Sequence, residues 1–361
     1  MWSGSDLEEG LDGISWDWLM NLKIWNPGVF HGKKQDQQFF EGWYYKLISP
    51  DREDRWAVIP GVFYHPDPQL RHCFVQVLNG ASSQVTYHRF PVGEFQADLS
   101  EFQIQIAGSS FHSHGFSLDL DSEGQRVIGE AAFEGLTPWP VTLLSPGVMG
   151  PYRFTPLMQT YHGILSLDHT IQGQLLINDQ IVDFSRGRGY MEKDWGRTFP
   201  RAYIWMQTNH FLEQGVSLTA SVATIPWLSG WFRGFLVGLL VDGRLYRFTT
   251  YLGSEILSLT VDDHHVNWVL TGKPISDRDR RFSRLELTIA AERSGGGLLS
   301  SPELDGMTPR ILESLTAVID VDLKGFTRGS GKPEIIYQGK GTCGGLEIAG
   351  TIDEIIDQRL E

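Results

Sequence analysis

The feature that most constrains this chain is an alternation of apolar and polar side chains that recurs through most of it after Pro27. Residues 74–78 and 102–106 alternate in this way, and similar short runs follow up to residue 352. A period of two places one face of a β-strand on a core, whereas a helix repeats every three or four residues. Asp242-Gly243 separates two such runs and favours the type I′ turn of a tight hairpin. The pattern predicts an all-β protein with antiparallel strands.

The 361 residues are enough for two domains, and the strand pattern has one clear interruption. Residues 136–152 are rich in Pro and Gly, which is typical of a boundary between domains. We therefore predict an N-terminal segment followed by two β-barrel or sandwich domains, at residues 1–26, 27–150 and 151–361.

Helical spacing is confined to two short places, residues 14–25 and 309–315, and the polar residues 294–309 are typical of a loop. The first of these predicts a short amphipathic N-terminal helix whose apolar face is formed by Ile14, Trp18, Leu22 and Trp25. Such a helix can pack on its own domain or lie peripherally on a membrane surface. No cluster of Lys or Arg lies beside it to attract anionic lipid, which favours the first alternative.

Composition excludes several classes of partner. The formal net charge is −14, and such an acidic surface repels nucleic acid. Only Cys73 and Cys343 are present, too few for a disulfide framework or a thiolate zinc site, which favours a reducing, cytoplasmic compartment. The first 13 residues lack the basic and apolar regions of a signal peptide, and no apolar stretch is long enough to span a bilayer.

Common catalytic motifs do not match. Residues 325–332 are rich in glycine, but their spacing and the following Pro333 do not fit a phosphate loop. No Gly-x-Ser-x-Gly sequence is present. His112 and His114 could share one strand face, but no third metal ligand follows nearby, so we predict no metal.

Three blocks carry residues suited to acid–base chemistry. Glu41 stands among five aromatic residues, where burial would keep its carboxyl protonated; the alternative is exposure to water or pairing with Lys46. Glu192 and Asp194 share a face of an extended strand, where like charge can raise one pKa; pairing with nearby arginines is the alternative. His162 follows a loop rich in Pro and Gly and can change protonation near neutral pH, or be a core histidine bonded to backbone.

These blocks resemble the tocopherol cyclase family. The matching stretches are residues 39–44, 146–152, 162–163 and 190–200, and thinner similarity extends from about residue 30 to 350. The resemblance implies two packed lipocalin-like β halves and a lipophilic small-molecule substrate. It also implies closure of a prenylated hydroquinone to a chromanol, without redox change or cofactor, and it does not fix the substrate of a bacterial branch.

Ring closure of this kind needs a proton for an alkene, exclusion of water and aromatic faces around a cation. We therefore predict Asp194 or Glu192 as the acid, with Glu41 next, and His162 as the group that orients or deprotonates the phenol. Substrate-binding residues are predicted to be Trp43, Tyr45, Tyr152, Met158, Tyr190, Trp195 and Arg197.

Other functions stay open from the sequence. A related enzyme could add water to an alkene, as in a carotenoid hydratase. A carrier of a lipid, quinone or pigment could use the same cavity without catalysis. A carbohydrate-binding or purely structural β-sandwich is a third class. Buried carboxyl groups in an aromatic cavity favour an enzyme over a carrier, because a carrier gains nothing from the cost of burying them. The sequence leaves the oligomeric state open.

Overall fold

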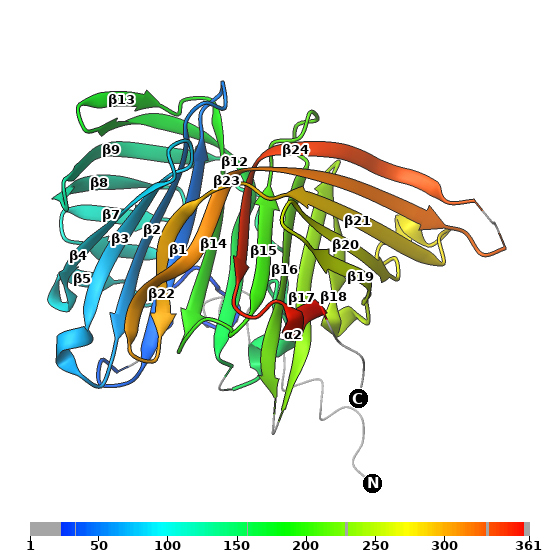
Figure 1. Cartoon of the computed structure of the whole chain (residues 1–361), viewed down its shortest axis with the longest axis horizontal. Coiled ribbons are helices and arrows are strands. Elements are labelled where there is room, and N and C mark those ends of the chain that lie inside the picture. The colour runs from blue at the N-terminus through cyan, green and yellow to red at the C-terminus, as the bar shows by residue number, and fades with distance from the viewer. Residues whose placement is uncertain (1–22, 33, 157, 228–229, 330–331, 357–361) are drawn as a thin grey trace, which may run out of the picture.

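The computed structural model describes residues 23–32, 34–156, 158–227, 230–329 and 332–356. Figure 1 shows two large antiparallel sheets side by side, joined where the central strands of the molecule meet. The described chain is nearly all β, as the alternation of side chains predicted. Most of the predicted N-terminal helix, with Ile14, Trp18 and Leu22, lies outside the described residues, and Trp25 at its end lies in a turn.

The first sheet has twelve strands, and its main path runs β4-β3-β2-β1-β14-β12-β9-β8-β7-β6-β5, with β13 paired to β12. These strands are β1 (Phe39–Ile48), β2 (Arg55–Tyr64), β3 (His72–Asn79), β4 (Gln84–Pro91), β5 (Phe95–Ala97), β6 (Gln103–Ile106), β7 (Ser109–His112), β8 (Gly115–Ser122), β9 (Gln125–Glu134), β12 (Thr160–Ile177), β13 (Gln180–Asp183) and β14 (Gly187–Gly196).

The second sheet has ten strands in the order β18-β17-β16-β15-β24-β23-β21-β20-β19, with β22 paired to β23. They are β15 (Tyr203–Thr208), β16 (Ser217–Trp227), β17 (Gly230–Val241), β18 (Arg244–Thr249), β19 (Glu255–Val261), β20 (His265–Gly272), β21 (Arg284–Glu292), β22 (Gly297–Glu303), β23 (Gly306–Phe326) and β24 (Glu334–Ala349).

The remaining elements are short. A two-stranded sheet is formed by β10 (Val141–Thr142) and β11 (Ser145–Pro146). The described helices are η1 (Pro68–Leu70), η2 (Val92–Glu94), η3 (Gly150–Phe154), η4 (Thr250–Leu252), η5 (Asp277–Asp279) and α2 (Asp353–Ile356). None of the helices in the described ranges is long and apolar enough to cross a membrane.

Two predictions about architecture need correction. The chain changes sheet between β14 and β15, and not at residue 150, because β12 and β14 pair with strands of the first sheet. Among the described strands, neither sheet closes on itself, so both are open, curved sheets and not closed barrels. The Pro- and Gly-rich residues 136–152 are a connection within the first half and contain β10 and β11.

The hairpin at Asp242-Gly243 is confirmed. Both residues have positive φ, 49° and 70°, as a type I′ turn requires, and the turn joins β17 to β18. The predicted helical turn at 309–315 is wrong, and so is most of the predicted loop at 294–309, because residues 297–315 belong to the hairpin of β22 and β23. Cross-strand pairing on both sides of β23 satisfies its backbone and overrides the local apolar spacing.

Three clusters of buried side chains hold the molecule together. One fills the first half, one fills the second half, and the third lies between the two sheets. The third includes Tyr44 and Tyr190 from the first sheet and Tyr203, Trp205 and Leu240 from the second. The hairpin of β22 and β23 adds to this contact, since the side-chain amide of Gln76 on β3 exchanges two hydrogen bonds with Ser300 of β22, at 2.9 and 2.8 Å.

Candidate active site between the two sheets

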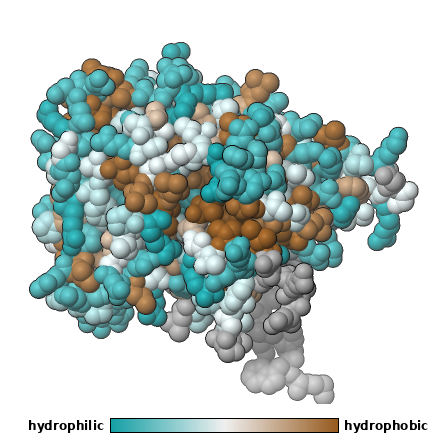
Figure 2. Space-filling view, in the orientation of Figure 1, coloured by the Kyte–Doolittle hydropathy of each residue, from teal (hydrophilic) through white to brown (hydrophobic). Residues whose placement is uncertain are grey.

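A cavity of about 190 Å³ lies between the two sheets, and most side chains around it are apolar. Its walls come from β1, β2, β3, β12 and β14 on one side and from β15, β16, β17, β22, β23 and β24 on the other. Figure 2 shows apolar residues gathered in the middle of the molecular face where the halves meet. The titratable residues that line the cavity include Tyr44, His162, Glu192, Asp194, Tyr203, Glu313 and Glu347.

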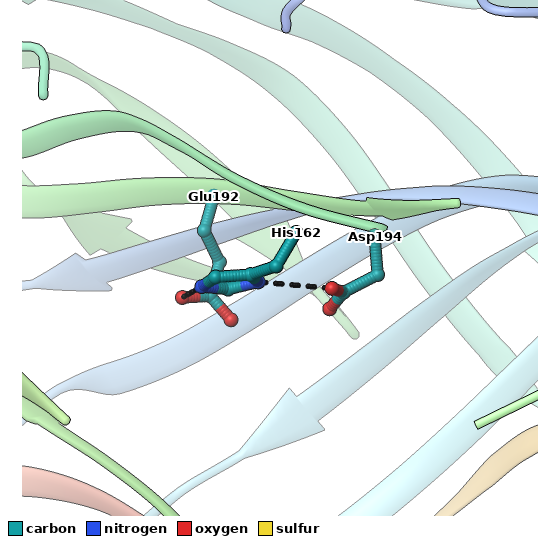
Figure 3. A group of neighbouring side chains, drawn as sticks. All are labelled: His162, Glu192 and Asp194. Carbon is teal, nitrogen blue, oxygen red and sulfur yellow. Dashed lines mark hydrogen bonds and ion pairs between the residues drawn. The ribbon is translucent and has the colours of Figure 1, made fainter. Parts of the chain in front are cut away.

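The period of two on β14 brings its acids to this cavity. Glu192 and Asp194 are two residues apart and face the second sheet, whereas Lys193 between them faces the core of the first half. His162 on β12 is the direct cross-strand partner of Asp194. Figure 3 shows the three side chains on the same side of the sheet, with the imidazole ring between the two carboxyl groups.

The imidazole contacts both acids. His162 Nδ1 lies 2.9 Å from Asp194 Oδ1, and His162 Nε2 lies 3.7 Å from Glu192 Oε2. Burial by itself would lower the pKa of His162, but the charges of Asp194 and Glu192 together with the hydrogen bond to Asp194 raise it to about 9. His162 is therefore an imidazolium at neutral pH, and it stabilises negative charge on both neighbours.

The pKa of Glu192 lies near neutral pH. Burial raises its pKa to about 7, and the charge of Asp194 adds to this, while His162 and hydrogen bonds from Tyr190 and Trp205 oppose it. The Tyr190 hydroxyl donates to Glu192 Oε2, and Trp205 Nε1 donates to the same oxygen at 3.1 Å. Because Trp205 belongs to β15, the second half of the molecule helps to position this acid.

The facing wall carries two acids that the sequence analysis missed. Glu313 on β23 and Glu347 on β24 line the cavity, and each accepts a hydrogen bond from a tyrosine hydroxyl. Tyr44 donates to Glu313 at 2.5 Å, and Tyr203 donates to Glu347 at 2.7 Å. The sequence could have indicated these residues, because each is an acid at an inward position of an apolar strand. The prediction of a helix at 309–315 obscured this pattern around Glu313.

Glu41 does not line the cavity. It is fully buried on the opposite face of β1, where it pairs with Lys193 and accepts a hydrogen bond from the His31 backbone N–H at 2.9 Å. Burial by itself would raise the pKa of Glu41, but Lys193 and His31 together lower it. The predicted neutral acid is thus an ionised partner in a structural ion pair. Lys46, the alternative partner, donates to Gln207 instead.

The predicted substrate-binding residues divide between the two faces of the sheet. Tyr152 and Met158 line the cavity, and Tyr190 lies behind Glu192, to which it donates its hydroxyl. Trp43, Tyr45 and Trp195 are buried in the core of the first half. Contrary to the prediction, they do not line the cavity. Arg197 is exposed, outside the cavity.

The three polar side chains of β12 and β14 also have the donor types of a cation site. One ligand atom of each of His162, Glu192 and Asp194 lies within 4.8 Å of the others, the single such group found among the described residues. In the structure the imidazole nitrogens face the two carboxyl groups, with a hydrogen bond to Asp194 at 2.9 Å and a longer ion-pair contact to Glu192 at 3.7 Å. His112 and His114 belong to no such group within the part of the chain that the structure describes.

Fold and cavity together define a class: a lipocalin-like all-β protein of two halves, with a histidine and four acids between them. A family model described as tocopherol cyclase-like matches residues 145–350, more than half of the chain. The chain belongs to this tocopherol cyclase-like family.

Curated relatives match a shorter part. The probable chloroplastic tocopherol cyclase of Oryza sativa subsp. japonica is 24% identical over 173 residues, 46% of this chain and 35% of that protein. The chloroplastic tocopherol cyclase of Zea mays is 24% identical over 173 residues, 46% of this chain and 34% of that protein. The matched region thus spans about a third of the length of these relatives.

Solved structures share the fold. A crystal structure of CghA with Sch210972 has a TM-score of 0.51 at 12% identity, covering 87% of this chain and 89% of that chain. A structure described as an AttH from Nitrosomonas europaea has a TM-score of 0.51 at 13% identity, covering 88% and 94%. At this identity the likeness concerns the fold alone.

Proposed function

We propose that this protein is an acid–base catalyst that closes a lipophilic prenylated hydroquinone to a chromanol. The observation that carries the proposal is the imidazole of His162 between the carboxyl groups of Asp194 and Glu192, at the wall of an apolar cavity. Family membership supports a substrate of this kind.

The reaction begins with the neutral carboxyl of Glu192, which protonates the less substituted carbon of a trisubstituted alkene. This leaves a tertiary carbocation on the substrate and a carboxylate on Glu192. The phenol oxygen attacks the cation, and the new C–O bond closes the ring. Cavity rings such as those of Tyr44, Phe199 and Trp205 face the cation, and the mostly apolar lining disfavours the water that would trap it.

The second half of the reaction removes one proton. Attack by a neutral phenol produces an oxonium, which is so acidic that the carboxylate of Asp194 is a sufficient base. When His162 Nε2 closes the 3.7 Å gap to Glu192, the imidazolium gives that carboxylate its Nε2 proton and takes the proton of Asp194 at Nδ1, which restores the acid. Substrate and product are isomers, and the cycle consumes neither a proton nor a redox equivalent.

The test is incubation of the purified protein with a prenylated benzoquinol in detergent, with chromatography to separate the chromanol from its isomeric substrate. Glu192→Gln is expected to lower turnover by about 10²- to 10⁴-fold, because it removes the acid, and Asp194→Asn should also lower it. Glu213→Gln is the matched control, because Glu213 accepts a hydrogen bond from Tyr337 at 3.0 Å outside the cavity.

Three outcomes would contradict the proposal. Full turnover by a folded Glu192→Gln variant would remove the assigned acid. Tight retention of the quinol by the wild-type protein without conversion would indicate a carrier. Formation of a tertiary alcohol in place of the chromanol would indicate a hydratase, in which water reaches the same carbocation.

A further inference from the structure

The wall of the cavity opposite His162 contains two acids placed directly against each other. Glu313 and Glu347 are cross-strand partners in the pairing of β23 with β24, and both line the cavity. Directly opposed side chains of an antiparallel pair have Cβ atoms about 5 Å apart, and like charges there repel. An apolar cavity makes that repulsion stronger than it would be in water.

Their hydrogen bonds leave one oxygen without a partner. Tyr44 donates to Glu313 Oε1 and Tyr203 donates to Glu347 Oε2. Neither acid forms an ion pair with any cation in the described ranges, and the nearby Lys46 donates to Gln207. Glu313 is fully buried, and its Oε2 has no hydrogen-bond partner among the described residues.

Charge and burial agree on the state of this pair. Burial raises the pKa of Glu313 to about 7, and the pKa of Glu347 is raised well above its ordinary value by burial and by the charge of Glu313. The two acids therefore titrate as one coupled unit, which holds a proton at neutral pH.

We propose that the pair of Glu313 and Glu347 carries a single proton and that the unpartnered Oε2 of Glu313 hydrogen-bonds a second oxygen of the substrate. The cavity then has polar groups on both walls, His162 on the first sheet and Glu313 on the second. The ligand class is an apolar molecule with two oxygen groups on one ring, and its description as a hydroquinone rests on the proposed function.

The physical reason is the cost of an unpaired buried oxygen. A hydroquinone offers one hydroxyl for ring closure and a second hydroxyl at the far side of the same ring. A ligand that lacks the second hydroxyl leaves Glu313 Oε2 desolvated and unpaired, which weakens binding. Glu313 thus acts as a specificity residue, and we expect the wild-type protein to prefer the hydroquinone by about 10- to 100-fold.

The test compares two probes of equal tail length, a hydroquinone and the corresponding phenol without the second hydroxyl, each with a saturated tail that has no alkene to protonate and so cannot cyclise. Dissociation constants are measured by calorimetry in detergent with the wild-type chain, Glu313→Leu and Glu313→Gln. Glu313→Leu should reduce the preference for the hydroquinone to about one, mainly by improving binding of the phenol. Glu213→Leu is the control, because it removes another glutamate bonded to a tyrosine and should keep the preference.

Infrared spectroscopy of the ligand-free protein tests the proton on this pair. The carbonyl stretch of a protonated carboxyl group should be present at neutral pH and should change in Glu313→Gln and in Glu347→Gln. The inference is overturned if the wild-type protein binds both probes equally, if Glu313→Leu keeps the preference, or if both amide variants leave the signal unchanged. All three readouts are independent of turnover, so they separate this inference from failure of the proposed reaction.

Discussion

Neighbouring residues of β14 face opposite sides of the first sheet. Glu192 faces the cavity, where burial raises its pKa to about 7, and Lys193 faces the core of the first half, where it pairs with Glu41. The two carboxyl groups are both buried, but Glu41 pairs directly with the Lys193 ammonium, whereas Glu192 has only the more distant His162 imidazole, at 3.7 Å, and also the negative charge of Asp194 nearby. The partner, and not the degree of burial, decides which acid keeps a proton.

We expect Glu41→Gln to destabilise the fold by about 3–5 kcal/mol, because it leaves the buried ammonium of Lys193 without a charged partner. Urea unfolding measures this change. Glu303→Gln breaks the more exposed pair with Arg310 and should cost at most about 1 kcal/mol. A Glu41→Gln variant with normal stability but no turnover would contradict this structural role and indicate that Glu41 takes part in the reaction.

Titration of Glu192 and His162 should make the free energy of unfolding depend on pH. The pKa of Glu192 is raised from 4.5 to about 7, so the folded state binds this proton more tightly than the unfolded state does. The resulting contribution to the free energy of unfolding is full below pH 4.5 and is lost by about pH 7. The pKa of His162 is raised from 6.5 to about 9. Its contribution to the free energy of unfolding is therefore full below pH 6.5 and is lost by about pH 9.

Urea unfolding between pH 5 and 8 tests this expectation. The wild-type free energy of unfolding should contain a component that declines with rising pH, and Glu192→Gln should flatten the decline. Identical pH profiles for the two proteins would contradict the raised pKa. Turnover should decline over the same range as Glu192 loses its proton.

In β23, the pairing of the whole strand determines which of its residues are buried. Ile311 and Leu315 are four apart, which is the spacing of a helix face, but both are buried together with Glu313 on one side of a long strand. Irregular register with β24 after Ser314 bends this strand, so it pairs with β22 at one end and β21 at the other.

The strand β1 offers a test of the cavity. Gly42 lines the cavity, and a Cβ atom added there would meet only Pro60 O, at 3.8 Å. Gly42→Leu should therefore fold and fill part of the space, lowering affinity for the prenylated quinol at least tenfold while stability changes by about 1 kcal/mol or less. Gly93→Leu is the control, because no atom lies within 4 Å of its added Cβ. Unchanged affinity in Gly42→Leu would place the ligand elsewhere.

The two halves depend on each other through buried polar contacts. Trp205 of the second half donates to Glu192, Tyr44 of the first half donates to Glu313, and Lys46 donates to Gln207 Oε1 at 2.8 Å. The buried cluster between the sheets surrounds these bonds. Separation of the halves would expose apolar surface and leave charged groups without partners, so we expect one folding unit.

Chemical unfolding should therefore show a single transition, with tryptophan fluorescence and far-ultraviolet circular dichroism changing together. Tyr44→Phe removes a bond between the halves and should lower the free energy of unfolding by about 1–3 kcal/mol without splitting the transition. Tyr337→Phe, which removes a tyrosine–glutamate bond within the second half, is the comparison. Two separated transitions in the wild-type protein would show that the halves fold independently.

Local patterns predicted the β class, the Asp242-Gly243 turn and the acids Glu192 and Asp194 on one face of a strand. These features depend on the period of two and on turn geometry, which are properties of a few consecutive residues. The same argument could not say which face of β1 or β14 meets the second sheet. For that reason the residues of both faces, Trp43 and Trp195 included, entered the predicted site.

Tertiary structure alone decided the rest. Residues far apart along the chain form the two walls of the cavity, so the pairing of Glu313 with Glu347 and its bond to Tyr44 have no local signature. The place where the chain changes sheet was also hidden, because the pattern of apolar residues along a strand does not say which sheet the strand joins. The charged groups that each acid meets in the folded protein, and not the residue type, raise the pKa of Glu192 and lower the pKa of Glu41.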